Sequence, residues 1–399
     1  MKERALEGVR VLDLSEGIAG PYCTRLLGGY GAEVIKVETP GEGDESRKVG
    51  PFPKDIPHPE RSALFLHLNI NKKGITLNLE AAAGRKILRQ LVKSVDILVE
   101  GFKPGQMSDW GLDYESLEEI NLGLVMTSIT PFGQTGPYRN YRWSSAVLDA
   151  LGGHTYMQGD PKREPLRYPD GIAEFTAGMF ASVATMGALF GSGESGQGQY
   201  IDISILDCLP GLDAFRTVRW THLRAVQERR GGRYAQWPGK IYPCRDGYVG
   251  LCGVGPTGTL FPMFSVMGIP ELLDPKYEDF AKRELYAEEL DAIIQPWLME
   301  HDRYEIFNAL QGVRVQAGVC NSAEDLLKDP GHEAREFWVE IEHPEAGKLT
   351  YPGEPVRMSE TAWQAIRAPL LGEHNKEIYH GEIGYSLHEL VQLRESGVI

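Results

Sequence analysis

The sequence is poor in the features that mark secreted, membrane and nucleic-acid-binding proteins. Its 399 residues include only five cysteines, an odd number without a CxxC pair, which argues against a disulfide framework. The 41 Lys and Arg residues are outnumbered by 56 Asp and Glu, and the formal charge of −15 argues against general binding to DNA or RNA. The first residues, MKERALEGVRVLDL, lack the apolar segment of a signal peptide. We therefore expect a cytoplasmic protein with no nucleic-acid or membrane partner.

One apolar stretch is long enough to need an explanation. Residues 172–190 read IAEFTAGMFASVATMGALF, which approaches the length of a membrane span. The charged Glu174 and the many Ala and Gly residues within it favour a buried, tightly packed helix instead. The remaining composition, 42% hydrophobic and 24% charged, is ordinary for a globular protein of this size.

The order of apolar runs predicts an α/β fold with a parallel sheet. Short β-rich runs alternate with helix-like stretches over the first 130 residues, as in the runs at 9–14, 32–38, 95–99 and 124–128. This alternation of β-rich runs and helix-like stretches ends after about residue 225. We expect a large domain in residues 1–225, a smaller α+β domain in 226–330, and a segment 331–399 that returns to the large domain.

The first strand, loop and helix have the outline of a dinucleotide-binding site. The loop, however, reads Gly17-Ile18-Ala19-Gly20-Pro21 and does not match G-x-G-x-x-G. The later Gly28-Gly29-Tyr30-Gly31 lies where the helix should end. The doubly wound architecture remains our prediction, whereas an NAD cofactor is disfavoured.

Several sequence blocks resemble, in fixed order, those of the family III CoA-transferases (the CaiB/BaiF type). They occupy 6–47, 69–79, 99–121, 127–139 and 195–208, with shorter blocks later in the chain. This resemblance implies a Rossmann-like large domain with a small domain, and two chains interlocked in an obligate dimer. It also implies an active site where the large domain of one chain meets the small domain of the other.

The resemblance implies a reaction as well. CoA would move from an acyl-CoA donor to a carboxylic acid through an enzyme carboxylate, by way of a mixed anhydride and an enzyme–CoA thioester. The coenzyme A thioester is then a substrate, and no permanently bound cofactor is expected. Succinyl-CoA as donor and an aromatic or dicarboxylic acid as acceptor is our working expectation.

The residues that would hold CoA also follow from the resemblance. CoA needs cations or peptide N–H groups for its phosphates and an apolar wall for its adenine ring. The matching positions are Gly17, Ile18, Ala19, Asn71, Lys72, Lys73, Gly101, Phe102, Lys103 and Arg142. Gly101 stands where the family usually has Asn. Arg47 is a further candidate, and a charged turn between strands is the plain alternative for residues 71–73.

The catalytic position departs from the family pattern. The family's nucleophile is an Asp, whereas the matching residue here is Glu174. The extra methylene moves the carboxylate by roughly an ångström, a displacement that affects rate. One hypothesis makes Glu174 a working nucleophile that forms a glutamyl-CoA thioester. The other makes this chain a catalytically silent subunit of a heteromeric enzyme, such as a benzylsuccinate CoA-transferase, whose Asp-bearing homologue supplies the nucleophile.

Further residues are candidates for substrate contacts. Gln134 and Tyr138 could orient the acyl group, and Arg233 suits an acidic substrate, with interface packing as its equal alternative. An acyl-CoA racemase would need a His/Asp pair, which His154 could form with Asp170 or Glu174. The local sequence resembles the transferases more. No histidine spacing indicates a metal site.

Overall fold

A computed structural model describes residues 4–212, 214–233, 236–253 and 259–399 of the chain. The chain divides into two compact units. The larger unit holds residues 1–155, 167–226 and 334–399, and the smaller holds 156–166 and 227–333. The boundaries near 226 and 333 lie close to those expected from the sequence, whereas the place of 156–166 in the smaller unit was not expected.

The larger unit is built on a six-stranded sheet in which every neighbouring pair is parallel. The order β3-β2-β1-β4-β5-β6 is that of the doubly wound α/β fold. The predicted α/β class is therefore confirmed. The strands are β1 (Arg10–Asp13), β2 (Glu33–Glu38), β3 (Lys72–Thr76), β4 (Ile97–Glu100), β5 (Val125–Thr130) and β6 (Gln199–Ser204).

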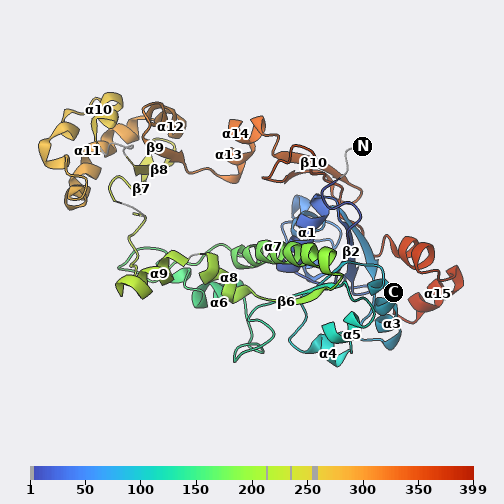
Figure 1. Cartoon of the computed structure of the whole chain (residues 1–399). Helices are drawn as coiled ribbons and strands as arrows, with labels where there is room; N and C mark the ends of the chain where they lie inside the picture. Colours follow the sequence, from blue (N-terminus) through green and yellow to red (C-terminus); the bar gives the residue numbers. More distant parts are fainter. Residues whose placement is uncertain (1–3, 213, 234–235, 254–258) are drawn as a thin grey trace. The chain divides into compact units, whose positions relative to one another are not determined.

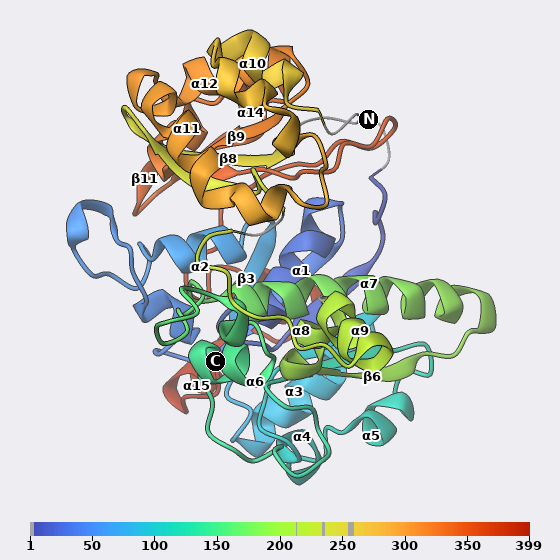
Figure 2. The ribbon, with the colours of Figure 1, turned by 90° about the vertical axis from the view of Figure 1, so that its left-hand side faces the viewer.

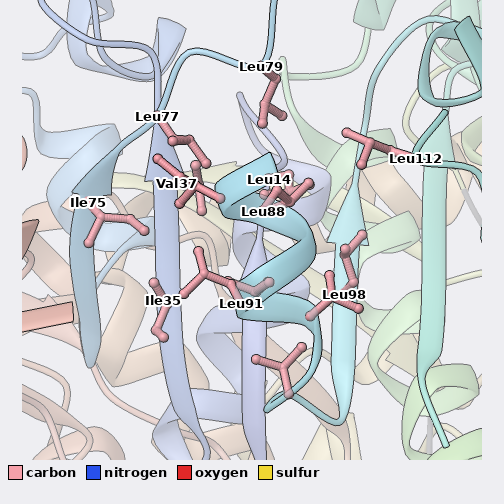
Figure 3. Close-up of a cluster of buried hydrophobic side chains, with 14 of the residues drawn as sticks. Leu14, Ile35, Val37, Ile75, Leu77, Leu79, Leu88, Leu91, Leu98 and Leu112 are labelled. Carbon is pink, nitrogen blue, oxygen red and sulfur yellow. The ribbon is translucent and has the colours of Figure 1, made fainter. Parts of the chain in front are cut away.

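Helices cover both faces of this sheet (Figures 1 and 2). On one face, α1 (Ala19–Gly29) and α7 (Ile172–Ser195) share a core cluster with Val34 of β2. On the other face, leucines of α3 (Ala82–Val92) lie beside Ile35, as Figure 3 shows. Neighbouring residues of a strand point to opposite faces, so Val34 and Ile35 belong to different clusters.

The apolar stretch predicted as a helix is α7. By length and composition this helix could cross a membrane. It packs instead against α1 and the sheet, with small residues on its buried face. Thr185 Oγ1 lies 2.7 Å from Thr127 Oγ1 of β5, and Ser192 Oγ donates to the Gly123 carbonyl at 2.9 Å. These contacts identify α7 as a covering helix of the sheet.

Residues 334–399 complete the larger unit. β10 (Trp338–His343) and β11 (Gly347–Pro352) form an antiparallel hairpin. A π-helix (Lys376–Glu382) and α15 (Leu387–Glu395) follow. The Tyr379 hydroxyl donates to the carbonyl of Thr76 at 2.7 Å and so anchors the π-helix at the end of β3.

The smaller unit contains a three-stranded antiparallel sheet in the order β7-β8-β9. A hairpin is formed by β7 (Lys240–Cys244) and β8 (Gly247–Gly253), and β9 is Gln316–Val319. α11 (Ala287–Glu300) and α12 (Arg303–Gly312) pack against it.

The other α-helices in the described part of the chain are α2 (Ala63–Leu68), α4 (Gln106–Asp109), α5 (Tyr114–Glu118), α6 (Ser145–Leu151), α8 (Ile205–Leu212), α9 (Ala214–Leu223), α10 (Phe261–Met267), α13 (Ala323–Leu327) and α14 (Pro330–Ala334).

Candidate active site

The carboxyl ends of β1 and β4 form the point at which the strand order reverses. In doubly wound sheets, ligands bind in the crevice at this edge. A Cβ built on Gly101 would lie 3.8 Å from Ser15 Cβ, so the loops after the two strands are neighbours. Six of the predicted CoA residues lie there: Gly17, Ile18 and Ala19 after β1, and Gly101, Phe102 and Lys103 after β4.

Glu174 lies in the first turn of α7, where the helix dipole favours a negative charge. The residue is buried, with 5% of its surface exposed. Ser145 Oγ, at the start of α6, donates a hydrogen bond of 2.5 Å to Oε1. Oε2 is buried and has no hydrogen-bond partner among the described residues. One oxygen is thus held in place while the other is free, an arrangement that suits a nucleophilic carboxylate.

The first turn of α7 lies against the loop after β1. A Cβ built on Gly171 would lie 3.2 Å from Ile18 Cδ1, and one built on Gly178 would lie 2.6 Å from the Ala19 carbonyl oxygen. A side chain at Gly178 would therefore push α7 away from α1, which begins at Ala19. These contacts place the predicted pantetheine loop beside the helix that carries Glu174.

Phe102 lines a cavity of about 520 Å³ near the ends of β1 and β2. Its ring packs edge-on against Trp110, with centroids 5.1 Å apart. This apolar wall suits an adenine ring. The charged residues around the cavity do not suit a phosphate, since they are all acidic: Glu16, Glu38, Glu42 and Glu80.

Lys103 lines a second cavity, of about 240 Å³, together with Gln134 and Tyr200. Its side chain is exposed and has no ion pair within the described part of the chain. It is therefore available to a phosphate. Gln134 lies close by, because its Oε1 accepts a hydrogen bond of 3.4 Å from the Gly105 N–H.

Glu100, the last residue of β4, is a buried carboxyl group in this second cavity. Burial raises its pKa to about 7, Ser128 and the Phe102 N–H oppose that shift, and Asp202 adds to it. The folded pKa lies above the unfolded value, so stability falls as pH rises from about 4.5 to 7.

Glu100→Gln is expected to raise the free energy of unfolding by about 1–3 kcal/mol at pH 8 and to have little effect at pH 4.5. Urea unfolding at both values checks this, and an equal change at the two pH values would contradict it.

Lys72 is placed differently from what a CoA contact requires. Its side chain is fully buried, and its ammonium lies 2.9 Å each from Asp13 Oδ2, Asn69 Oδ1 and the Pro21 carbonyl. Three acceptors satisfy its three N–H donors, so none is left for a phosphate. Although burial alone would raise the pKa of Asp13, Lys36 and Lys72 lower it. This arrangement favours a supporting role for Lys72 under the first loop, and its contact with CoA stays an untested prediction.

The neighbours of Lys72 are also engaged within the larger unit. Asn71 has a φ of +63° and bonds to the main chain of Gln364 and Ile366 at 2.7 and 2.6 Å. Lys73 pairs with Glu33 and Glu377 at 2.5 and 2.8 Å and remains about one-third exposed. The plain alternative of a charged turn is wrong for the two lysines, because they open strand β3.

The arginine candidates separate into one buried and one exposed residue. Arg47 is fully buried and makes two hydrogen bonds to Glu38, at 2.6 and 2.9 Å, and one to Glu60. It therefore stabilises the fold rather than offering a free cation. Arg142 is exposed in the loop after β5, without an ion pair among the described residues. Tyr138, in the same loop, packs on Tyr141 with centroids 5.2 Å apart.

Arg233 belongs to the smaller unit. Its Nη2 donates to Asp291 Oδ2 at 2.8 Å, and Asp291 also accepts from Trp237, Lys240 and Tyr242. Arg233 Nη1 is buried and has no hydrogen-bond partner in the described part of the chain. Arg233 thus keeps one guanidinium nitrogen without a partner, and its contact with an acidic substrate stays a prediction.

Two residues beside Glu174 were missed by sequence reasoning. Ser145 and Asp149 lie one helical turn apart on α6, whose spacing places them on the same face. Asp149 is 1% exposed and His154, shortly after the helix, is 5% exposed. Both oxygens of Asp149 and both ring nitrogens of His154 lack a hydrogen-bond partner among the described residues. Their only sequence signal was the i, i+4 spacing of Ser and Asp.

Known proteins match this chain over nearly its whole length. The model of CoA-transferase family III matches residues 6–375. The succinyl-CoA–D-citramalate CoA-transferase of Chloroflexus aurantiacus is 33% identical, with 99% of this chain and 98% of that protein covered. The BbsE subunit of succinyl-CoA:(R)-benzylsuccinate CoA-transferase from Thauera aromatica is also 33% identical, with 98% and 97% covered.

A solved structure extends the similarity to the fold. The CaiB/BaiF family protein from Brucella suis superposes with a TM-score of 0.85 at 29% identity, and the match covers 95% of this chain and all of that one. The resemblance seen in the sequence blocks is thereby confirmed. The chain is an enzyme of the CoA-transferase class and belongs to CoA-transferase family III.

Proposed function

We propose that the chain transfers CoA from an acyl-CoA donor to a carboxylic acid with Glu174 as the nucleophile. The observation that carries this proposal is the state of the Glu174 carboxylate: one oxygen held by Ser145, the other buried and without a partner. A carboxylate in the first turn of a helix, beside the predicted pantetheine loop, has the position that the reaction requires.

The steps balance without an external energy source. The free Glu174 oxygen attacks the thioester carbonyl and displaces CoA thiolate, which leaves a mixed anhydride. The thiolate attacks the glutamyl carbonyl, which gives a glutamyl-CoA thioester and releases the donor acid. The acceptor carboxylate then attacks this thioester and displaces CoA thiolate, which leaves a second mixed anhydride. The thiolate attacks the acceptor carbonyl of this anhydride, which gives the new acyl-CoA and restores the Glu174 carboxylate. Peptide N–H groups at the start of α7 are suited to stabilise the tetrahedral oxyanions.

Succinyl-CoA is the donor that we favour, and a dicarboxylic acid is the acceptor. Both relatives described above are named for succinyl-CoA. Arg233, with its one unpaired nitrogen, is a suitable partner for the distal carboxylate of such an acid. We further propose the interlocked dimer, which would bring a small domain to the site of the other chain.

Mass spectrometry of the purified chain tests the nucleophile. After incubation with succinyl-CoA and then borohydride or hydroxylamine, a modified peptide containing Glu174 is expected. The same treatment of Glu174→Gln, and of wild type with free CoA, should give none. An adduct on another carboxylate, or no adduct with any of a panel of acyl-CoAs, would contradict the assignment.

A heteromeric enzyme is the second candidate function. It is favoured by the similarity to BbsE, which is named as a subunit. In that case the chain binds CoA and completes the site of an Asp-bearing homologue. Native mass spectrometry of the chain purified from its own cells separates the two, since a partner of similar mass would support the heteromer and a homodimer with turnover would exclude it. For the racemase alternative, the pair of His154 with Asp170 is disfavoured because Asp170 is exposed and paired with Arg167.

A further inference from the structure

Three neighbouring buried side chains carry polar atoms that lack a hydrogen-bond partner in the described part of the chain. They are the Glu174 carboxylate, the Asp149 carboxylate and the His154 imidazole, each at least 95% buried. Glu174 Oε2, both Asp149 oxygens and both His154 nitrogens make no hydrogen bond to any described residue. Buried polar atoms are nearly always paired in folded proteins, so these atoms require a hydrogen-bond partner from outside the described residues.

The three side chains belong to one place in the larger unit. The Ser145–Glu174 hydrogen bond joins α6 to the first turn of α7. Asp149 lies one turn further along the face of α6 that carries Ser145. Burial raises the pKa of Asp149, His154 opposes the shift and Glu174 adds to it, which agrees with this proximity. The His154 ring also contacts the Tyr168 ring, at 5.5 Å between centroids.

The chemistry of the pair defines what fits between them. An ionised carboxylate only accepts hydrogen bonds, whereas an imidazole offers an N–H donor. A ligand that binds both must donate to Asp149 and accept from His154. A hydroxyl group does both with a single oxygen atom. A second carboxylate at this position would be repelled by Asp149 and Glu174.

We propose that Asp149 and His154 bind a hydroxyl group next to the reacting carboxyl of the acceptor, so that the enzyme selects 2-hydroxy acids. This inference rests on the proposed function, because it places the acceptor carboxyl at Glu174. Asp149 lies one turn of α6 from Ser145, which holds Glu174, so a group bound by Asp149 lies near the reacting carboxyl. Asp149 and His154 are then specificity-determining residues and take no part in the covalent steps.

The test compares acids that differ only in this hydroxyl. Acceptor kcat/KM is measured for 2-hydroxyglutarate against glutarate and for lactate against propionate, with succinyl-CoA as donor. Wild type is expected to favour the hydroxy acid by roughly 10- to 100-fold, the range of one hydrogen bond to a charged group. Asp149→Asn and His154→Leu should bring the ratio close to one, mainly through KM. His154→Gln, which keeps an N–H donor, should retain part of the preference.

Controls separate this role from a structural one. Asp170→Asn removes the same charge nearby, but Asp170 is exposed and paired with Arg167, so the preference should not change. Asp149→Asn should leave the melting temperature unchanged or raise it, because the carboxylate has no donor to lose. A lower melting temperature with an unchanged acid preference would overturn the proposal.

A binding measurement makes the outcome independent of turnover. Thermal shifts of the wild-type chain with CoA are recorded for each acid of the two pairs. Stronger stabilisation by the hydroxy acids, lost in Asp149→Asn, supports the inference even if Glu174 proves not to be the nucleophile. Equal shifts within both pairs would overturn it. Weaker binding of CoA alone by the variants would also overturn it, since the pair would then bind a pantetheine amide.

Discussion

Replacing Glu174 by glutamine is expected to abolish CoA transfer by the isolated chain. The amide is nearly the same size and can still accept the Ser145 hydrogen bond, but it cannot form the anhydride or the thioester. Loss of a covalent nucleophile should lower kcat by about a thousandfold or more. CoA binding and the melting temperature should change little, because no other hydrogen bond of the Glu174 side chain is lost.

The aspartate variant is the matched control for this experiment. Glu174→Asp keeps the carboxylate but withdraws it by about one methylene from Ser145, and a shift of that size costs about a hundredfold in rate. We expect the order wild type, Asp, Gln in kcat, measured from acyl-CoA formation by liquid chromatography. Full activity of the glutamine variant would exclude Glu174 as the nucleophile. Activity of the glutamine variant only beside a copurified second chain would support the heteromer.

Replacing Lys72 by methionine is expected to destabilise the larger unit strongly. Asp13 would remain fully buried and lose its ammonium partner, while Thr24 and Ser15 still donate to it. Breaking a buried ion pair from one side typically costs 3–5 kcal/mol, and we expect about 3 kcal/mol here because Lys36 still acts on Asp13. Chemical denaturation at pH 7 measures this directly.

Lys73→Met is the control one residue away. The Lys73 ammonium is about one-third exposed in its pairs with Glu33 and Glu377, so its loss should cost less than about 1 kcal/mol. Similar small losses in both variants, with a large rise in KM for acyl-CoA only for Lys72→Met, would instead restore Lys72 as a CoA contact. The pair of variants therefore separates the two roles of the segment.

The sequence predicted those parts of the fold that depend on neighbouring residues. Alternating apolar runs gave the strands and helices of the parallel sheet, because a strand buried on both faces is apolar throughout. The 17–19 loop could be located because it lies in an uninterrupted sequence block, and Glu174 could be located because it stands at the position of the family's aspartate. That both lie at the same edge of the sheet then follows from the doubly wound strand order.

Contacts between distant residues could not be read from the chain. Lys72 looks like any surface lysine until folding brings Asp13, 59 positions earlier, to its ammonium. Arg47 likewise depends on Glu38 and Glu60. Asp149 carried no signal of burial, because aspartate is mostly exposed in folded proteins. Side-chain burial and pairing arise from tertiary packing, which local sequence patterns do not encode.

The glycine at position 178 has a consequence for how this enzyme could evolve. Glu174 precedes it by one turn of the same helix, and the Ala19 carbonyl fixes how closely that helix approaches the ligand loop. An exchange to alanine at this position would shift Glu174, the proposed nucleophile, away from the 17–19 loop without changing any side chain that we propose to contact the substrate. Selection for a longer or bulkier acyl group could therefore act on a buried backbone contact, far from any residue that recognises the acid.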